Sequence, residues 1–198
     1  MLFRSSVSAV NDAPVASGSA TLSADAEDTA AGSVNTATVS SLFTSNFDDS
    51  ADDKTALGGS TAGTLSGVAI TSYTADAAKG TWQYSSNGTS WSDISSVAGA
   101  SSALTLKSTD QLRFVPSSNF NGAAPGLTVS LIDSSTSVTT GVTADVSTRG
   151  GTTAFSASTV ALSHSVTAVN DAPVASGSAT LSADAEDTAA GSVNTATV

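Results

Sequence analysis

The sequence of 198 residues predicts an all-β fold, in which the central part of the chain forms one antiparallel β-sandwich. Ser, Thr, Ala, Gly and Val dominate the composition, and only 5% of the residues are aromatic. β-Branched side chains suit a pleated sheet, whereas Gly and Ser interrupt helices. Short apolar runs also alternate with turn residues, which is typical of sheet proteins. Because large side chains are few, we expect a core of Val, Leu, Ile and Ala.

Strands are expected wherever such a run lies between turn signals. The predicted strands are 67–73, 81–85, 91–94, 103–107, 111–116, 127–133, 141–147 and 158–169. Alternation places Leu112 and Phe114 on one face of their strand. It likewise places Leu127, Val129 and Leu131 on one face of theirs. These faces give two sheets enough apolar surface to pack against each other.

The segment 81–94 is predicted to be a β-hairpin. Its Asn87-Gly88 pair can adopt the positive φ of a tight turn. The hairpin would bring Trp82, Tyr84 and Trp91 close together. Because the chain has so few aromatic residues, we expect these rings in the core and not exposed for stacking on sugars.

A long segment of the sequence occurs twice. Residues 7–39 recur at 166–198 with one change, from Ser8 to Thr167. Such identity predicts a tandem array of repeats. The chain is therefore interpreted as the last strand and linker of a preceding repeat (1–12), a complete β-sandwich repeat (13–169) and the truncated start of the next repeat (170–198).

Charge and composition exclude several classes of partner. The formal net charge is −11, with six Lys and Arg against 17 Asp and Glu. Such a chain would repel nucleic-acid phosphates and anionic lipids, so nucleic acid is not an expected partner. The N-terminal residues contain no apolar run long enough for a signal sequence or a membrane span, so direct membrane insertion is not expected either. The absence of cysteine excludes disulfides and cysteine metal sites.

Enzymatic activity is not expected. His164 is the only histidine, and its alternation with Val160, Leu162 and Val166 predicts that it faces inward. The sequence shows no nucleophile elbow, no phosphate-binding glycine loop and no pair of acids that would flank a cleft.

The motif AVNDAPV occupies 9–15 and again 168–174, where one repeat would meet the next. Pro14 stiffens this junction and keeps Ala13 extended. VNDAP followed by EDT, GTWQYSSNGTSW and LRFVPSSNFNG resembles the cadherin-like repeats of giant bacterial adhesins of the RTX type, which are exported by type I secretion. The resemblance implies an Ig-like or cadherin-like sandwich at the extracellular bacterial cell surface, with neighbouring repeats of the same chain as its partners.

In such repeats, linker Asn and Asp residues join acidic residues of the adjoining domain to bind Ca²⁺, which fixes the angle between domains. The carboxylates of this chain favour the same arrangement. Its only two glutamates, Glu27 and Glu186, occupy the same repeat position, and each is followed by Asp. Calcium takes about six to eight oxygen ligands, often including a bidentate Glu. The candidate calcium ligands are Asn11, Asp12, Glu27, Asp28, Asp48, Asp49 and Asp53.

The Asp-rich loop around Asp48 is open to a second interpretation, because such loops in acidic proteins are often only solvated turns. In the second copy, Asp171, Glu186 and Asp187 are expected to form at best an incomplete site, since the chain ends before a counterpart of Asp48.

The leading hypothesis is a calcium-rigidified structural extender, or spacer, of a surface adhesin that supports cell adhesion or biofilm formation. One alternative is a glycan- or surface-binding module that uses the tryptophan hairpin or the Asp48 loop. Another is a self-assembling surface filament or surface-layer subunit, in which 170–198 completes the sheet of a neighbour by strand addition. These alternatives differ in partner: homotypic assembly needs only further copies of the protein.

Overall fold

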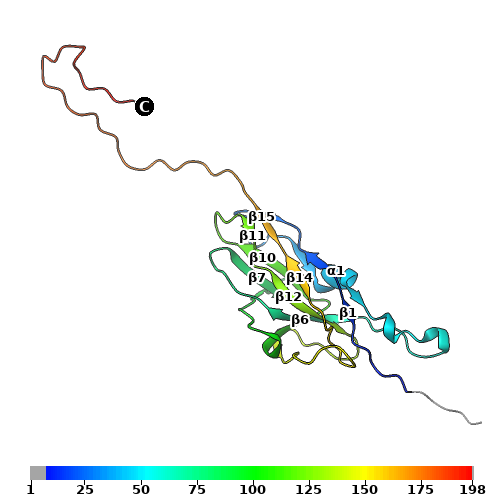
Figure 1. The fold of residues 1–198 in the computed structure, drawn as a ribbon. Coiled ribbons are helices and arrows are strands. Elements are labelled where there is room, and N and C mark those ends of the chain that lie inside the picture. Colours follow the sequence, from blue (N-terminus) through cyan, green and yellow to red (C-terminus); the bar gives the residue numbers. More distant parts are fainter. Residues whose placement is uncertain (1–7, 198) are drawn as a thin grey trace, which may run out of the picture.

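A computed structural model describes residues 8–197 (Figure 1). Strands account for 33% of the residues and helices for 9%, so the predicted β class is confirmed. The strands form several open sheets, mostly antiparallel. Residues 1–7, which the sequence analysis assigned to the end of a preceding repeat, lie outside the described residues. No helix within 8–197 is long and apolar enough to cross a membrane.

The largest sheet contains six strands in the order β13-β9-β6-β12-β14-β2. Its strands are β13 (Val142–Ala144), β9 (Ala103–Lys107), β6 (Leu65–Ser72), β12 (Leu127–Asp133), β14 (Val160–Ser163) and β2 (Ser19–Thr21). Every neighbouring pair is antiparallel except β14 and β2, which run parallel. An early strand of the chain therefore lies beside a late one and points the same way.

A second sheet has four antiparallel strands in the order β4-β10-β7-β8. They are β4 (Thr36–Thr38), β10 (Gln111–Pro116), β7 (Gly80–Ser85) and β8 (Ser92–Asp93). A short helix, α1 (Val39–Phe43), follows β4, and the Thr38 side chain caps it by accepting a hydrogen bond from the Ser41 backbone N–H. The helix buries Val39, Leu42 and Phe43.

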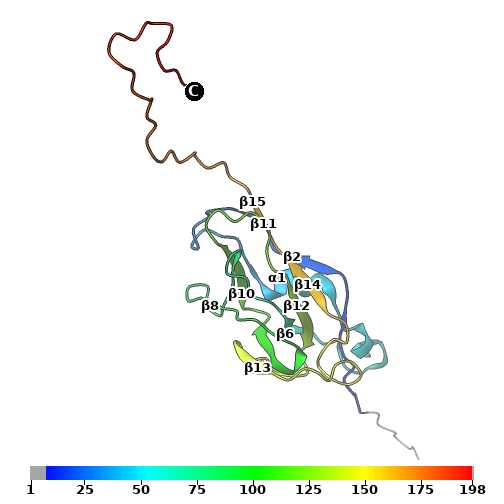
Figure 2. The ribbon, with the colours of Figure 1, turned by 60° about the vertical axis from the view of Figure 1, so that its left-hand side comes forward.

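Two small sheets and four 3₁₀ turns complete the fold. One sheet pairs β1 (Val15–Ala16) with β5 (Phe47–Asp48). The other contains β11 (Gly122–Ala123), β15 (Ser165–Thr167) and β3 (Asp25–Ala26), in that order. The 3₁₀ turns are η1 (Thr44–Asn46), η2 (Ser50–Asp52), η3 (Thr55–Leu57) and η4 (Ala100–Ser102). β11 and β15 lie at the end where the chain leaves toward its C-terminus, which we name the C-terminal pole (Figures 1 and 2). Residues 8–14 lie at the opposite end, the N-terminal pole (Figures 1 and 2).

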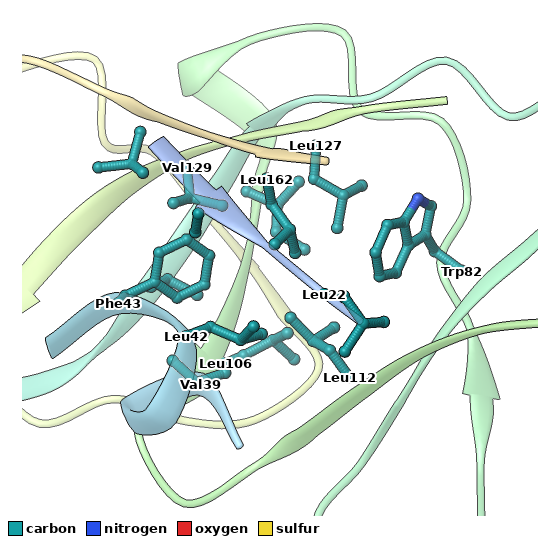
Figure 3. Close-up of a cluster of buried hydrophobic side chains, with 14 of the residues drawn as sticks. Leu22, Val39, Leu42, Phe43, Trp82, Leu106, Leu112, Leu127, Val129 and Leu162 are labelled. Atoms are coloured by element: carbon teal, nitrogen blue, oxygen red, sulfur yellow. The ribbon is translucent and has the colours of Figure 1, made fainter. Parts of the chain in front are cut away.

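One hydrophobic core draws side chains from both large sheets (Figure 3). Trp82, Leu112 and Phe114 come from the four-stranded sheet and Val129 and Leu162 from the six-stranded sheet, each at most 1% exposed. Each large apolar side chain that is fully buried contributes about 1.5–3 kcal/mol. The predicted inward faces of the strands at 111–116 and 127–133 are confirmed.

Every predicted strand region contains a strand, with some changes of extent. The region 141–147 contracts to β13, and 158–169 divides into β14 and β15 on either side of His164. His164 is 3% exposed, so its predicted inward orientation is confirmed. Before residue 65, strands β1–β5 and helix α1 were not foreseen.

The predicted hairpin is confirmed, since β7 and β8 pair through Gln83–Asp93 and Tyr84–Ser92. Gly88 has the expected positive φ, of 74°, but Asn87 does not, and residues 85–91 form a longer loop than the predicted tight turn. The aromatic rings, however, divide between two environments. Trp82 is fully buried, whereas Trp91 is half-buried and lies beneath the Arg113 guanidinium, 3.9 Å from the ring centroid. The expectation of a core position therefore fails for Trp91, because the ring packs on a neighbouring strand's outer face.

Residues 170–197 contain no strand, although they repeat the sequence of 11–38. Leu181 and Val193 are 54% and 41% exposed, whereas their first-copy equivalents, Leu22 and Val34, are 2% and 6% exposed. The same residues thus form strands only where other strands lie beside them, because a short strand alone buries too little surface.

Candidate functional site

At the N-terminal pole, two acids hold the segment 9–12, which was predicted to be the linker between repeats. Asp133 ends β12, is 0% exposed, and accepts a hydrogen bond of 3.2 Å from the Asn11 side-chain amide. The same amide donates to the Thr153 carbonyl at 3.0 Å. The Asp12 backbone N–H donates to the Asp52 carboxylate at 2.9 Å. The linker is therefore anchored by two carboxylates from separate segments of the domain.

Asp49 lies in the same region and is 4% exposed, yet neither of its carboxylate oxygens has a hydrogen-bond partner. Burial raises the pKa of this carboxyl, and the nearby charges of Asp133 and Asp52 raise it further. The Gly63 backbone N–H faces the carboxylate and opposes this rise, but the contact does not satisfy hydrogen-bond geometry. A buried charge without a partner is costly unless a cation neutralises it. This carboxylate accordingly fits a cation ligand.

Asp48 and Asp53 are exposed and serve local turns. Asp48 accepts a hydrogen bond from the Ser50 backbone N–H at 2.9 Å. Asp53 accepts bonds from the Thr55 backbone N–H at 2.9 Å and from the Thr55 hydroxyl at 2.6 Å. These bonds lower the pKa of both carboxyls. The two residues therefore match the solvated-turn interpretation better than Asp49 does.

At the C-terminal pole, a second group of polar residues surrounds the departing chain. Glu27 is 6% exposed, and its carboxylate accepts hydrogen bonds from the Val169 backbone N–H at 2.5 Å and from the Asn121 side-chain amide at 2.9 Å. Asp28 has a φ of 60° and accepts a bond from the Asn119 backbone N–H at 2.9 Å. Glu27 thus holds the outgoing linker as Asp133 holds the incoming one.

Within one molecule the structure does not gather the candidate ligands Asn11, Asp12, Glu27, Asp28, Asp48, Asp49 and Asp53 into one site, but divides them between the two poles. Strands β2 and β3 run parallel to β14 and β15, so the chain travels from one pole at Ala13 to the other at Glu27. Asn11, Asp12, Asp48, Asp49 and Asp53 consequently lie toward the N-terminal pole, and Glu27 and Asp28 lie at the C-terminal pole.

Within residues 8–197, no three acidic or histidine side chains converge closely enough to hold a metal ion by themselves. Of the second-copy candidates, Asp171, Glu186 and Asp187 are all exposed. None of the three is held by the strands that surround its first-copy equivalent.

Asp52, Asp133 and Asn121 lie at the two poles but are not among the candidate ligands predicted from the sequence, although Asp52 belongs to the Asp-rich loop around Asp48. Asp133 carried a usable signal, because it continues the inward alternation of Val129 and Leu131. An acid at an inward position needs a partner, which marks it as a candidate ligand. No comparable signal in the sequence distinguishes Asn121 from other loop residues.

Comparison with protein families, with curated proteins and with solved structures finds no match. Inferences about function therefore depend on the geometry of the two poles. Its central feature is that one linker sequence is held by a buried carboxylate at each end of the fold.

A buried titratable pair lies between the core and the C-terminal pole. His164 Nε2 is 3.5 Å from an oxygen of Asp25, and the two residues are 3% and 6% exposed. The rings of Phe114 and Trp82 flank the imidazole at centroid distances of 5.4 and 6.0 Å. Burial lowers the pKa of His164, although Asp25 opposes the effect. The folded state therefore favours the neutral imidazole.

We expect this histidine to make the fold less stable in mild acid. The unfolded chain titrates near the ordinary value of 6.5 and the folded chain lower, so the contribution is complete above 6.5 and is lost as pH falls through the folded pKa. Melting temperatures measured from about pH 7.5 to 5.5 should fall in the wild type and stay flatter in His164→Phe, since no other side chain has an unperturbed pKa in this window. Equal slopes for the two proteins would contradict the assignment.

Proposed function

We propose that this chain is a structural extender from a bacterial cell-surface adhesin, built as an Ig-like or cadherin-like sandwich repeat whose junctions calcium rigidifies. The sharing of one core by the six-stranded and four-stranded sheets supports a sandwich. The recurrence of 7–39 at 166–198 supports a tandem array. The observation that carries the proposal is the way the two poles hold the linker.

The two ends of the fold present the two sides of one junction. Because 168–171 repeats 9–12, Asn170 is the equivalent of Asn11, and Val169 precedes it. In an array, Glu27 of one repeat would hold the linker at Val169. The next repeat would hold the adjoining residue, the equivalent of Asn11, through its Asp133. Consecutive Cα atoms are about 3.8 Å apart, so the two carboxylates would approach neighbouring residues of one linker.

Calcium fits the oxygen-rich junction that results. Asp49 contributes a buried carboxylate with no other partner, and Asp133 and Asp52 contribute charges beside it. Asn11 and Asp12 bring linker oxygens, and Glu27 of the preceding repeat would complete the set. Calcium takes about six to eight oxygen ligands in flexible geometry, which suits donors from two domains and a linker. The N-terminal pole of this chain already holds all of these donors except Glu27 of a preceding repeat.

An ion held in this way would restrict rotation about the linker and turn a string of repeats into a rod. Extension of a distant adhesive region from the cell surface is then the task of the repeat. The glycan-binding alternative gains no support from the hairpin, since Trp82 is buried in the core and Arg113 covers the Trp91 ring.

Calcium titration of the 198-residue chain tests the proposal. We expect calcium to release heat and to raise the free energy of unfolding, by about 2.7 kcal/mol when free calcium exceeds the dissociation constant about 100-fold. Asp49→Asn should abolish both effects. The same variant should melt higher than wild type in chelator, because it removes a buried charge that has no partner.

Two variants serve as controls. Asp76→Asn changes an acid in the turn before β7, whose carboxylate accepts a bond from the Ala78 backbone N–H, and should titrate like wild type. Glu27→Gln alters the opposite pole and should leave the heat of the N-terminal pole in place. A wild-type chain whose heat and melting are unchanged by calcium, or an Asp49→Asn variant that binds as well as wild type, would rule the proposal out.

A further inference from the structure

The C-terminal segment 174–197 has the sequence of a strand-forming segment but none of its strands. Its equivalent, 15–38, forms β1, β2, β3 and β4. Leu181 and Val193 consequently expose side chains that the first copy buries. One local feature does persist, because Asn194 donates to Asp184 at 2.9 Å as Asn35 donates to Asp25 at 2.9 Å. The segment therefore keeps its turn and lacks only the strands that would pair with it.

Residues 40–169 carry the surface that recognises this sequence. β14 and β15 pair in parallel with β2 and β3, and β10 pairs antiparallel with β4. The first pairing is in register at Ser163 and Thr21, whose hydroxyl oxygens are 3.1 Å apart. Leu22 then enters the core that contains Trp82. Residues 40–169 thus bind this sequence through backbone pairing with its strands and through burial of Leu22 in the core.

The segment 174–197 would have to reverse direction and run back along the fold to reach this surface in its own molecule. The surface binds the sequence with its start at the N-terminal pole, where the Ala13 backbone N–H donates to Gly151. Thr167 lies at the other pole, paired with Ala26. The run 160–167 alone spans roughly 23 Å at about 3.3 Å per residue. The seven residues from Thr167 to Val174 reach at most about 25 Å, which leaves no length for the reversal that placing Val174 at the N-terminal pole requires.

We propose that the segment 174–197 of one molecule docks on residues 40–169 of a second molecule of this chain, in the place of that molecule's own 15–38. The identity of the two segments makes the contacts in both arrangements the same. The result is a head-to-tail assembly with one direction. This pairing needs no metal and does not rest on the proposed function.

Competition with the native segment sets the conditions for docking. The 15–38 segment is tethered to its own surface, which corresponds to an effective concentration in the millimolar range. At micromolar protein the native segment therefore wins, and the intact chain is expected to be a monomer. Docking between molecules becomes favourable once the native segment is disabled.

The variant Leu22→Asp disables the native segment and leaves Leu181 intact. We expect this variant to form oligomers whose mass rises with concentration in light scattering after size exclusion, with strand content preserved. Leu181→Asp should remain a monomer with the melting temperature of wild type. The double variant Leu22→Asp with Leu181→Asp is the matched control and should lose the oligomers.

A cysteine trap keeps the test decisive if Leu22→Asp folds poorly, since the chain contains no cysteine of its own. Thr180 is the equivalent of Thr21, so Ser163→Cys with Thr180→Cys should give intermolecular disulfides in register. Ser163→Cys with Thr21→Cys should give an internal disulfide and a monomer. Refolding the Ser163→Cys, Thr180→Cys protein at rising concentration lets the two segments compete for the surface in a background with native Leu22.

Linked oligomer should increase about tenfold when Leu22→Asp is added to the Ser163→Cys, Thr180→Cys protein, because the tethered competitor is then lost. Disulfides confined to single molecules, or equal linkage in the presence of Leu181→Asp, would overturn the proposal. Oligomers of Leu22→Asp that persist with Leu181→Asp would also overturn it, since they would reflect aggregation without segment docking.

Discussion

Replacement of Trp82 by alanine is expected to lower the free energy of unfolding by about 3–5 kcal/mol. The indole is fully buried, donates a hydrogen bond of 2.7 Å from Nε1 to the Pro125 carbonyl, and meets the Phe114 ring edge-on at a centroid distance of 5.5 Å. Its removal would leave a cavity between the two large sheets and an unsatisfied carbonyl. Urea unfolding followed by circular dichroism measures the effect without depending on tryptophan fluorescence.

Trp91→Ala is the matched control in the same hairpin. Trp91 is half-buried and its main contact is the Arg113 guanidinium, an interaction that contributes about 0.5–1 kcal/mol at exposed sites. The two tryptophan variants should therefore differ several-fold in their cost. Similar losses from both would show that the core does not depend on Trp82 as described.

Gly80→Ala is expected to cost about 2–5 kcal/mol, which combines backbone strain with overpacking. Gly80 begins β7 with a φ of 140°, a conformation that L-residues rarely adopt. A Cβ at this position would also overlap the Val115 carbonyl oxygen and lie 2.7 Å from the Phe114 ring. Neither neighbour can move freely, because both belong to the paired strand β10. The free energy of unfolding in urea reports the loss.

Gly99→Ala provides the comparison. Gly99 has an extended φ of 173°, and a Cβ there would meet no atom within 4 Å. The change should be neutral or stabilise the fold by up to about 1 kcal/mol, since alanine restricts the unfolded chain. Equal destabilisation by the two substitutions would contradict the strain and overlap assigned to Gly80.

The strands that could be predicted are those whose own residues alternate over several positions. β10 and β12 have six and seven residues, and their inward faces follow from the apolar pattern alone. β1, β2 and β3 have two or three residues each, too few for a pattern. They exist because β5, β14 and β15 lie beside them. Residues 170–197 repeat the sequence that contains β1, β2 and β3, yet they form no strand, because no other strands lie beside them.

The sequence singled out acidic residues but did not show how the fold arranges them. The composition and the linker motif pointed to Asp12, Glu27 and Asp49 as residues of interest. The resemblance to cadherin-like repeats grouped them as one ligand set, yet β2 and β3 carry the chain the length of the fold between Asp12 and Glu27. The pole at which a residue lies depends on the pairing of β2 with β14 and of β3 with β15. These pairings join residues far apart in the sequence, so the neighbouring residues do not reveal them. Asp133 was missed although it continues the inward alternation of Val129 and Leu131, and only its contact with Asn11 depends on the fold.

The parallel alignment of β2 with β14 determines how the fold would respond to tension. The chain enters at one pole and leaves at the other, so a pull on its ends would draw β2 and β14 past each other along their length (Figure 1). Their hydrogen bonds lie across that direction and would be loaded together in shear, whereas a hairpin pulled open from one end loses its bonds one at a time. A fold connected in this way would resist stretching through the pairing of an early strand with a late one.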